Sequence, residues 1–120
     1  MIWDPNLRAK IFVVDSSPND YEQLVESSNQ AGTQVVFFES GRAALQAQAA
    51  DTPAMWIVNL RLSDMSGIDL QSMLRSCGCC APIALVGDEY RPSDEITARC
   101  AGADLYFAKP IQHDVLGMTA

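Results

Sequence analysis

Residues 10–15 read KIFVVD, four consecutive apolar side chains followed by an acid. A short apolar run rich in β-branched residues is typical of a strand buried on both faces, as in a parallel sheet. A helix is predicted to follow at once, because Ser17 is a good N-cap, Pro18 suits the first turn and the charge of Asp20 is favourable there. The chain therefore opens with a strand–helix unit.

The same strand–helix cycle continues along the 120-residue chain. Apolar runs of strand length recur at residues 35–38, 54–58, 82–86 and 105–108. Helical patterns follow these runs at residues 41–50, 68–77, 92–101 and 111–116. Strands that alternate with helices through short loops predict a parallel sheet covered on both faces. The expected fold is α/β, a three-layer, doubly wound, five-stranded parallel sheet of flavodoxin-like order 2-1-3-4-5.

Length and composition predict one cytoplasmic domain over residues 1–120, with a last helix so short that it could be truncated. The chain has 15 acidic and 8 basic residues, a formal net charge of −7. Because an acidic surface repels phosphate backbones, direct nucleic acid binding by this domain is not expected. No apolar run approaches the roughly 20 residues that cross a bilayer, and the first residues do not resemble a signal peptide. No contact with membranes is expected.

The four cysteines, Cys77, Cys79, Cys80 and Cys100, raise the question of a metal site. Tight zinc sites usually combine a Cys-x-x-Cys pair with two further ligands at a matching spacing. The chain has one histidine and no second cysteine pair of this kind. Reduced structural or surface thiols are therefore expected, and the role of the Cys77, Cys79 and Cys80 cluster stays open.

Functional residues are expected where the predicted strands end, because doubly wound sheets bind ligands outside the carboxyl ends of their strands. These ends carry Asp15 with Ser16, Asn59, Gly87 and Lys109. The acids Asp88 and Glu89, which follow Gly87, are interpreted as a solvated face.

These strand ends resemble those of the response regulator receiver family, also called CheY-like, and the likeness covers essentially the whole chain. Asp15 followed by Pro18 is similar to the family's acidic turn after the first strand. The most specific likeness is residues 101–110, AGADLYFAKP, in which Tyr106 stands three residues before Lys109. Gly87 lies 22 residues before Lys109, where the family has Thr or Ser.

The resemblance implies a role for each of these positions. Asn59, together with residues 65–67, resembles the segment around the phosphoacceptor and would stand at the acceptor position. Tyr106 would be the family's switch aromatic, although it could equally be a packed core residue. By the same resemblance, the pocket residues are Asp15, Ser16, Gly87 and Lys109.

The residue types at these positions do not suit phosphoryl transfer, which needs a carboxylate nucleophile, Mg²⁺ and donors for the phosphoryl oxygens. Asn59 is neutral, Ser16 replaces a family acid, and Gly87 has no hydroxyl. Asp15 is left as the one carboxylate of a weak or vestigial Mg²⁺ site. The prediction is a pseudo-receiver: a two-component or phosphorelay signalling module that is not an enzyme, needs no cofactor and works independently of phosphorylation.

Its expected partner is a protein, such as a kinase, an output domain or another signalling protein, and a homodimer stays open. One alternative is a phosphorylatable receiver with a disabling substitution at Asn59. A haloacid-dehalogenase-type phosphatase would place a second Asp where Ser17 stands, and a flavodoxin-type flavin site would need a glycine in the loop after Asp15. Asp15 and Lys109 could also form a purely structural ion pair.

Overall fold

The computed structural model describes residues 9–111. Five parallel strands form one sheet in the order β2-β1-β3-β4-β5, which confirms the predicted topology. The strands are β1 (Lys10–Val14), β2 (Gln34–Phe38), β3 (Met55–Asn59), β4 (Ile83–Gly87) and β5 (Leu105–Ala108). The helices are η1 (Pro18–Tyr21), a 3-10 turn, and the α-helices α1 (Glu22–Ala31), α2 (Gly41–Gln48), α3 (Gly67–Ser76) and α4 (Pro92–Cys100). Within residues 9–111, no helix has the length and apolar character to cross a membrane.

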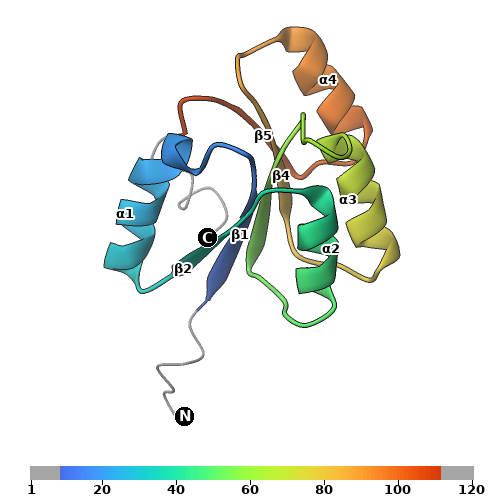
Figure 1. Cartoon of the computed structure of the whole chain (residues 1–120). Helices are drawn as coiled ribbons and strands as arrows, with labels where there is room; N and C mark the ends of the chain where they lie inside the picture. Colours follow the sequence, from blue (N-terminus) through green and yellow to red (C-terminus); the bar gives the residue numbers. More distant parts are fainter. Residues whose placement is uncertain (1–8, 112–120) are drawn as a thin grey trace.

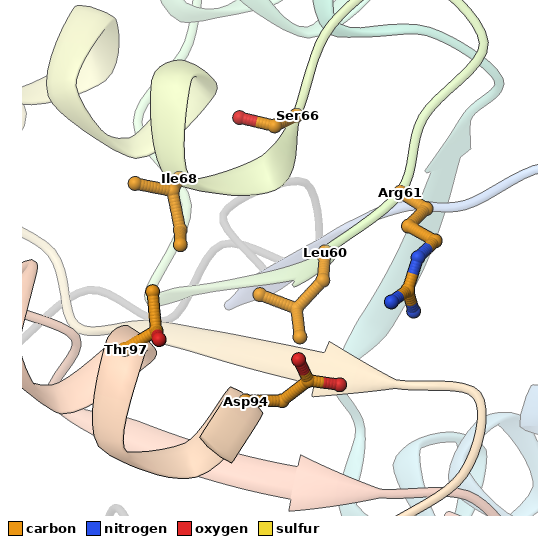
Figure 2. A pocket seen from close by; sticks show the side chains of 6 residues that line it. All are labelled: Leu60, Arg61, Ser66, Ile68, Asp94 and Thr97. Atoms are coloured by element: carbon orange, nitrogen blue, oxygen red, sulfur yellow. The ribbon is translucent and has the colours of Figure 1, made fainter. Parts of the chain in front are cut away.

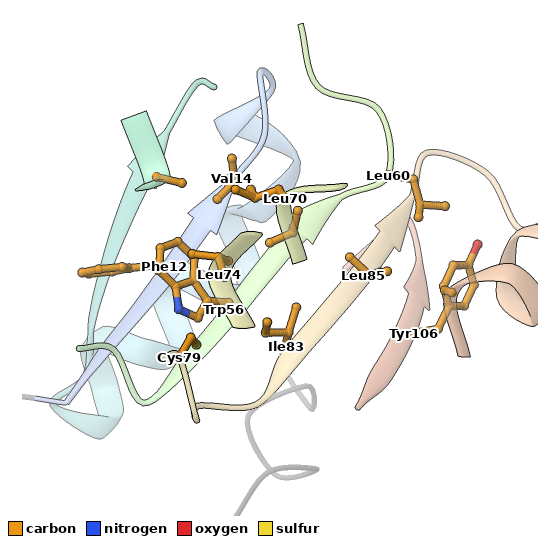
Figure 3. Close-up of a cluster of buried hydrophobic side chains, with 13 residues drawn as sticks. Phe12, Val14, Trp56, Leu60, Leu70, Leu74, Cys79, Ile83, Leu85 and Tyr106 are labelled. Atoms are coloured by element: carbon orange, nitrogen blue, oxygen red, sulfur yellow. The ribbon is translucent and has the colours of Figure 1, made fainter. Parts of the chain in front are cut away.

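Helices cover both faces of the sheet, as predicted. Figure 1 shows α1 on one face and α2, α3 and α4 on the other. Each face has its own hydrophobic core. Tyr21 and Leu24 pack with Ile57 under α1, whereas Leu70 and Leu74 of α3 pack with Trp56 on the opposite face (Figure 3).

The central strands have the burial that their continuous apolar runs predicted. Val13, Val14, Ile57 and Val58 are fully buried although neighbouring residues point to opposite faces. Burial of each such side chain stabilises the fold by about 1.5–3 kcal/mol. The three-layer packing thereby holds the carboxyl ends of β1, β3 and β4 side by side.

The start of the first helix differs from the prediction. The side chain of Ser17 makes no capping hydrogen bond, and the chain forms the 3-10 turn η1 before α1 begins. The backbone N–H of Ser17 instead donates to Oδ1 of Asp15 at 3.0 Å. Ser17 is thus the N-cap residue and Pro18 stands in the first turn, as predicted, but the helix that they open is the 3-10 turn η1 and the Ser17 side chain does not cap it. Beyond Ile111, the predicted helix 111–116 lies outside the described residues.

The four cysteines are free, with Cys79 buried and the other three exposed. The loop that carries Cys79 is held by Arg75, whose Nη1 donates to the carbonyl oxygens of Cys79 at 3.0 Å and Ala81 at 2.8 Å. Cys79 also belongs to the core on the α3 face. Packing thus accounts for Cys79 without a ligand.

Candidate functional site at the carboxyl edge

Asp15, Asn59 and Lys109 meet at the carboxyl edge of the sheet. Asp15 follows β1, Asn59 ends β3 and Lys109 follows β5. The Nδ2 atom of Asn59 donates to Oδ2 of Asp15 at 3.0 Å, and Nζ of Lys109 lies 3.0 Å from the same oxygen. Asp15 and Asn59 are both only 2% exposed. Three strand ends that are distant in sequence therefore form one buried polar cluster.

The carboxylate of Asp15 has four donors around it. In addition to Asn59 and Lys109, Oδ2 accepts a hydrogen bond from the hydroxyl of Tyr21 at 2.6 Å, and Oδ1 accepts the N–H of Ser17. Burial and, next, the bond to Asp15 raise the pKa of Tyr21, so this tyrosine remains a neutral donor. A carboxylate offers about four lone-pair sites. Three of these donors lie at Oδ2 and one at Oδ1, so Oδ2 is the fully partnered oxygen of Asp15.

Lys109 lies among three carboxylates. Its Nζ atom is 3.0 Å from Asp15, 2.7 Å from Asp20 and 3.0 Å from Asp88, and its side chain is 11% exposed. Burial on its own would lower the pKa of Lys109, but the hydrogen bonds to Asp20, Asp88 and Asp15 outweigh it and raise that pKa. Lys109 is therefore a fixed positive charge at neutral pH.

The carboxamide of Asn59 bridges two acids. Its Nδ2 atom donates to Asp15 and, at 2.9 Å, to Oδ1 of Asp88, while its Oδ1 accepts the backbone N–H of Arg61 at 2.8 Å. The Arg61 N–H can only donate, so it sets the orientation of the amide. The bond from Asn59 and then that from Lys109 lower the pKa of Asp88. Both polar atoms of the Asn59 side chain are satisfied.

Asp20 and Asp88 also belong to this cluster, although the sequence pattern did not predict them there. The pattern predicted a single carboxylate, Asp15, whereas the structure places three around Lys109. Asp88 is half exposed but is bound by Asn59 and Lys109, so its interpretation as merely solvated was wrong. Their positions in the sequence could have indicated this, since both acids stand in loops that follow the carboxyl ends of strands.

Gly87, Tyr106 and Ser16 lie outside the charged cluster. Gly87 ends β4, and its carbonyl oxygen accepts the backbone N–H of Lys109 at 3.0 Å. Tyr106 lies on β5, is 8% exposed and belongs to the core on the α3 face. Ser16 is exposed at the rim. The structure thus brings Asp15, Asn59 and Lys109 into contact and places the other predicted residues around them.

The loop after Asn59 is held by two contacts. A Cβ at Gly67 would lie 2.2 Å from the carbonyl oxygen of Asn59, so only glycine permits this approach of α3 to β3. Further along the same loop, the carboxylate of Asp64 accepts the backbone N–H groups of Gly41 and Arg42 at 3.0 Å each and caps α2. These contacts position the backbone on which the Asn59 amide stands.

A shallow hollow of about 270 Å³ lies beside this cluster, between the loop after β3 and the start of α4. Figure 2 shows the apolar side chains of Leu60 and Ile68 among the lining residues, with the carboxylate of Asp94 next to Leu60. Ser66 and Thr97 complete the lining. The residues of the charged cluster do not line it, so it is a separate surface feature.

The fold and the site define a class: a doubly wound α/β domain with an acidic, lysine-containing pocket at the carboxyl edge of the sheet. The family model of the response regulator receiver domain matches residues 11–119 of the chain. The chain belongs to this family and is a receiver module of the two-component type.

Two curated relatives illustrate the match. The transcriptional regulatory protein KdpE of Mycobacterium tuberculosis is 36% identical over 104 residues, which cover 87% of this chain and 46% of that protein. The response regulator MprA of Mycolicibacterium vanbaalenii is 31% identical over 101 residues, covering 84% and 44%. The chain therefore spans about half the length of the curated relatives it matches.

Solved structures show the same fold. The receiver domain of the Francisella response regulator 1452 superposes with a TM-score of 0.79 at 19% identity and covers 92% of both chains. The chemotaxis response regulator CheY4 of Vibrio cholerae superposes with a TM-score of 0.80 at 22% identity, covering 94% of this chain and 99% of that one. At these identities, the similarity is one of fold alone.

Proposed function

We propose that this receiver domain signals without phosphorylation and acts by binding another protein. The observation that carries the proposal is the bridging amide of Asn59. Its two N–H groups point into the carboxylates of Asp15 and Asp88, and its oxygen is bonded to the backbone of Arg61. An amide is a far weaker nucleophile than a carboxylate, and here both of its polar atoms are engaged in hydrogen bonds.

The acids nearest to Asn59 in sequence do not replace the missing nucleophile. Asp51 forms an ion pair with Lys10, the first residue of β1, and so lies at the opposite, amino edge of the sheet. Asp64 has both carboxylate oxygens bonded to the start of α2. Asp20 and Asp88 are bound to Lys109. The other carboxylates of this region thus have structural partners.

The donor set does not fit a tightly bound Mg²⁺. This ion prefers free carboxylate oxygens in a near-octahedral arrangement. Oδ2 of Asp15 is already bound by Tyr21, Asn59 and Lys109, and the ammonium of Lys109 provides the positive charge there. A divalent cation at Oδ2 would compete with that ammonium for the same oxygen. We therefore expect Mg²⁺ affinity in the millimolar range or weaker, an order-of-magnitude expectation from the ligand chemistry.

Two further positions support the proposal. Gly87 has no hydroxyl to donate to a phosphoryl oxygen, and Ser16 provides no second carboxylate. Each lost interaction of this kind typically costs a few kcal/mol of transition-state stabilisation, hence orders of magnitude in rate. The residues Asn59, Ser16 and Gly87 together leave the pocket without the chemistry of phosphoryl transfer.

The partner is proposed from the family and from charge. Receiver domains bind kinases or output domains, and the curated relatives, which are about twice as long, include a transcriptional regulatory protein. We propose that this domain likewise acts on an output domain or another signalling protein, through the face formed by α4 and β5. With a net charge of −7, direct contact of this domain with nucleic acid is not part of the proposal.

The test is treatment with a small phosphodonor and Mg²⁺, followed by intact mass over time. The wild type should remain unmodified and the Asn59→Asp variant should be labelled only slowly. Adding Ser16→Asp and Gly87→Thr should increase labelling more than the single change, because such groups act as a unit. A variant such as Asn19→Asp, at an exposed position near the same edge, is the matched control for added charge.

Two results would contradict the proposal in different ways. Stoichiometric labelling of the wild type, including labelling mapped to Asp20 or Asp88, would show that the domain accepts a phosphoryl group without Asp at residue 59. Full labelling of Asn59→Asp alone would favour the alternative, an otherwise intact phosphorylatable receiver with a single disabling residue.

A further inference from the structure

The edge strand β2 lacks the features that usually protect the edge of a sheet. It pairs with β1 alone and is the outermost strand on its side (teal in Figure 3). Natural sheets commonly place a charge, a proline or a bulge in such a strand, because the free backbone groups of an edge bind other strands. The sequence of β2, QVVFF, has no charged residue and no proline, and its register with β1 is continuous.

The apolar side chains of β2 are only half-buried. Val36 and Phe38 pack against the core on the α3 face, and Val35 and Phe37 pack against the core under α1. All four side chains keep some exposed surface, whereas every residue of the central strands β3 and β4 is buried. Both hydrophobic cores therefore extend to this edge of the sheet and remain incompletely covered there.

The hydrogen bonds to β1 show which backbone groups of β2 face outward. The N–H of Gln34 donates to the carbonyl oxygen of Ala9 at 2.9 Å, and the carbonyl oxygen of Phe38 accepts, at 3.0 Å, the N–H of the residue that follows β1. In a parallel pair, the residues of a strand direct their backbone groups to either side in alternation. The N–H and C=O groups of Val35 and Phe37 therefore face away from β1, where residues 9–111 contain no further strand.

We propose that β2 is a homodimer surface, at which the strand pairs antiparallel with β2 of a second copy of this chain. A twofold axis at Val36 places Val35 of each copy opposite Phe37 of the other, and each such pair exchanges two N–H to C=O hydrogen bonds. The outward backbone groups of both residues are then satisfied. Val36 meets its own counterpart at the axis, where the side chains of the two strands approach closely and cover each other.

Charge permits this register but limits the strength of the dimer. Glu39, which follows β2 and is exposed, lies opposite the uncharged Thr33 in the antiparallel pairing, so no two like charges face each other. The net charge of −7 on each copy still causes a general repulsion. Because a pair of five-residue strands buries less surface than a standard interface, we expect a dissociation constant of roughly 0.1 mM. Added salt should strengthen the dimer by screening the repulsion.

The proposed dimer leaves the opposite end of the sheet accessible. β2 and β5 are the two outer strands, so a dimer through β2 presents the face of α4 and β5 twice in one particle. The inference depends neither on the chemistry of residue 59 nor on the identity of the partner proposed above.

The direct test combines sedimentation equilibrium with amide hydrogen exchange measured by NMR. The mass of the wild type should rise from 13.1 kDa toward twice that value as the protein concentration increases. Exchange of the Val35 and Phe37 amides should slow several-fold over the same range, whereas Val36 and Phe38, whose amides face β1, should be protected throughout. A chain that stays monomeric at millimolar concentration, or a dimer in which Val35 and Phe37 exchange as in the monomer, would overturn the proposal.

Charge variants at Thr33 test the antiparallel register. Thr33→Lys places opposite charges next to each other, since Glu39 of the other copy lies across from residue 33, and should lower the dissociation constant several-fold. Thr33→Glu places like charges there and should raise this constant several-fold. Ser72→Lys and Ser72→Glu, at an exposed position of α3, change the net charge equally and are the matched controls. Equal effects at residues 33 and 72 would overturn the proposed pairing.

A proline in β2 tests the backbone hydrogen bonds of the dimer. Val35→Pro removes an outward N–H and leaves the bonds to β1 intact, because proline is tolerated in an edge strand where the N–H faces away from the sheet. The dissociation constant should rise strongly while the circular dichroism spectrum stays that of the wild type. Val36→Pro, which removes an N–H directed to β1, should instead lower the urea midpoint. Dimerisation of Val35→Pro as tight as that of the wild type would overturn the proposal, and the Thr33 variants decide the question if Val35→Pro does not fold.

Discussion

At the carboxyl edge of the sheet, the side around Lys109 and the side around Tyr106 are stabilised by different forces. The charged half, formed by Asp15, Asp20, Asn59, Asp88 and Lys109, satisfies its buried polar atoms with partners from four separate segments. The aromatic half, formed by Gly87, Tyr90 and Tyr106, is filled by rings and leaves the Tyr106 hydroxyl without a hydrogen bond among the described residues.

The difference shows how one edge can combine a rigid and an adjustable part. The charged half resists change, because removing Lys109 leaves the buried carboxylate of Asp15 without its counter-charge. In the aromatic half, a single carbon added at Gly87 would lie 2.6 Å from the Tyr106 hydroxyl, so one of the two groups would have to shift. Changes in the charged half should therefore appear mainly as stability, and changes in the aromatic half mainly as the position of a ring.

The largest effect is expected for Lys109→Met. This change leaves Asp15, Asp20 and Asp88 without their shared cation, and the free energy of unfolding should fall by about 3 kcal/mol, as for other buried ion pairs that lose one partner. Urea unfolding at neutral pH measures the loss.

Lys10→Met is its matched control, because the ion pair of Lys10 with Asp51 lies at the other edge and is more exposed. Its loss should be below about 1 kcal/mol. Equal losses for the two variants would mean that the charged half is no more stabilising than an ordinary surface ion pair.

The second-largest loss of stability is expected for Asn59→Asp. It replaces two N–H donors by a charged oxygen that faces Asp15 and Asp88, so stability with a chelator present should fall by about 2 kcal/mol. Mg²⁺ should raise the melting temperature of this variant more than that of the wild type, because the added carboxylate favours cation binding. A variant as stable as the wild type in the chelator would show that the amide bridge contributes little.

Two buried tyrosines test the comparison directly. Tyr21→Phe removes a hydroxyl that donates to the charged acceptor Asp15 at 2.6 Å and should cost about 1.5 kcal/mol. Tyr106→Phe removes a hydroxyl without such a bond and should be neutral within about 0.5 kcal/mol or slightly stabilising. The measurement is the difference in urea unfolding free energy between the two variants. A larger loss of unfolding free energy for Tyr106→Phe than for Tyr21→Phe would mean that the aromatic half, and not the charged half, depends on a hydroxyl hydrogen bond.

The smallest effect is expected for Asp88→Asn and depends on pH. Because the folded state lowers the pKa of Asp88, its contribution is fully present above the ordinary Asp pKa of about 3.9 and is lost as pH falls through the lower folded value. The stability difference from the wild type should be below about 1 kcal/mol at neutral pH, since the side chain is half exposed. Unfolding curves from pH 7 to pH 3 should show this difference shrinking only in the acidic range.

Glu89→Gln, at the exposed neighbouring acid, is the comparison variant. The stability difference between Asp88→Asn and the wild type could instead stay constant down to pH 3. That result would mean that the contacts of Asp88 do not depend on its negative charge.

The sequence by itself determined the fold and the place of the site. Alternating strand and helix patterns with short loops leave few topologies, and the predicted order matched the structure. Asp15, Asn59 and Lys109 stand at strand ends, and parallel strands bring those ends to one edge whatever the side chains do. Local pattern and chain connectivity were sufficient for both conclusions.

Only the tertiary structure decided how the side chains at that edge are partnered. The sequence pattern placed Asp20 at a helix start and Asp88 on a solvated face. It did not predict their contacts with Lys109, because these join segments far apart in sequence. The hydroxyl of Tyr106 lies within 2.6 Å of where a Cβ on Gly87 of the neighbouring strand would stand. Such contacts depend on the reach and rotamer of each side chain across the packed elements, which periodicity and spacing along one chain do not encode.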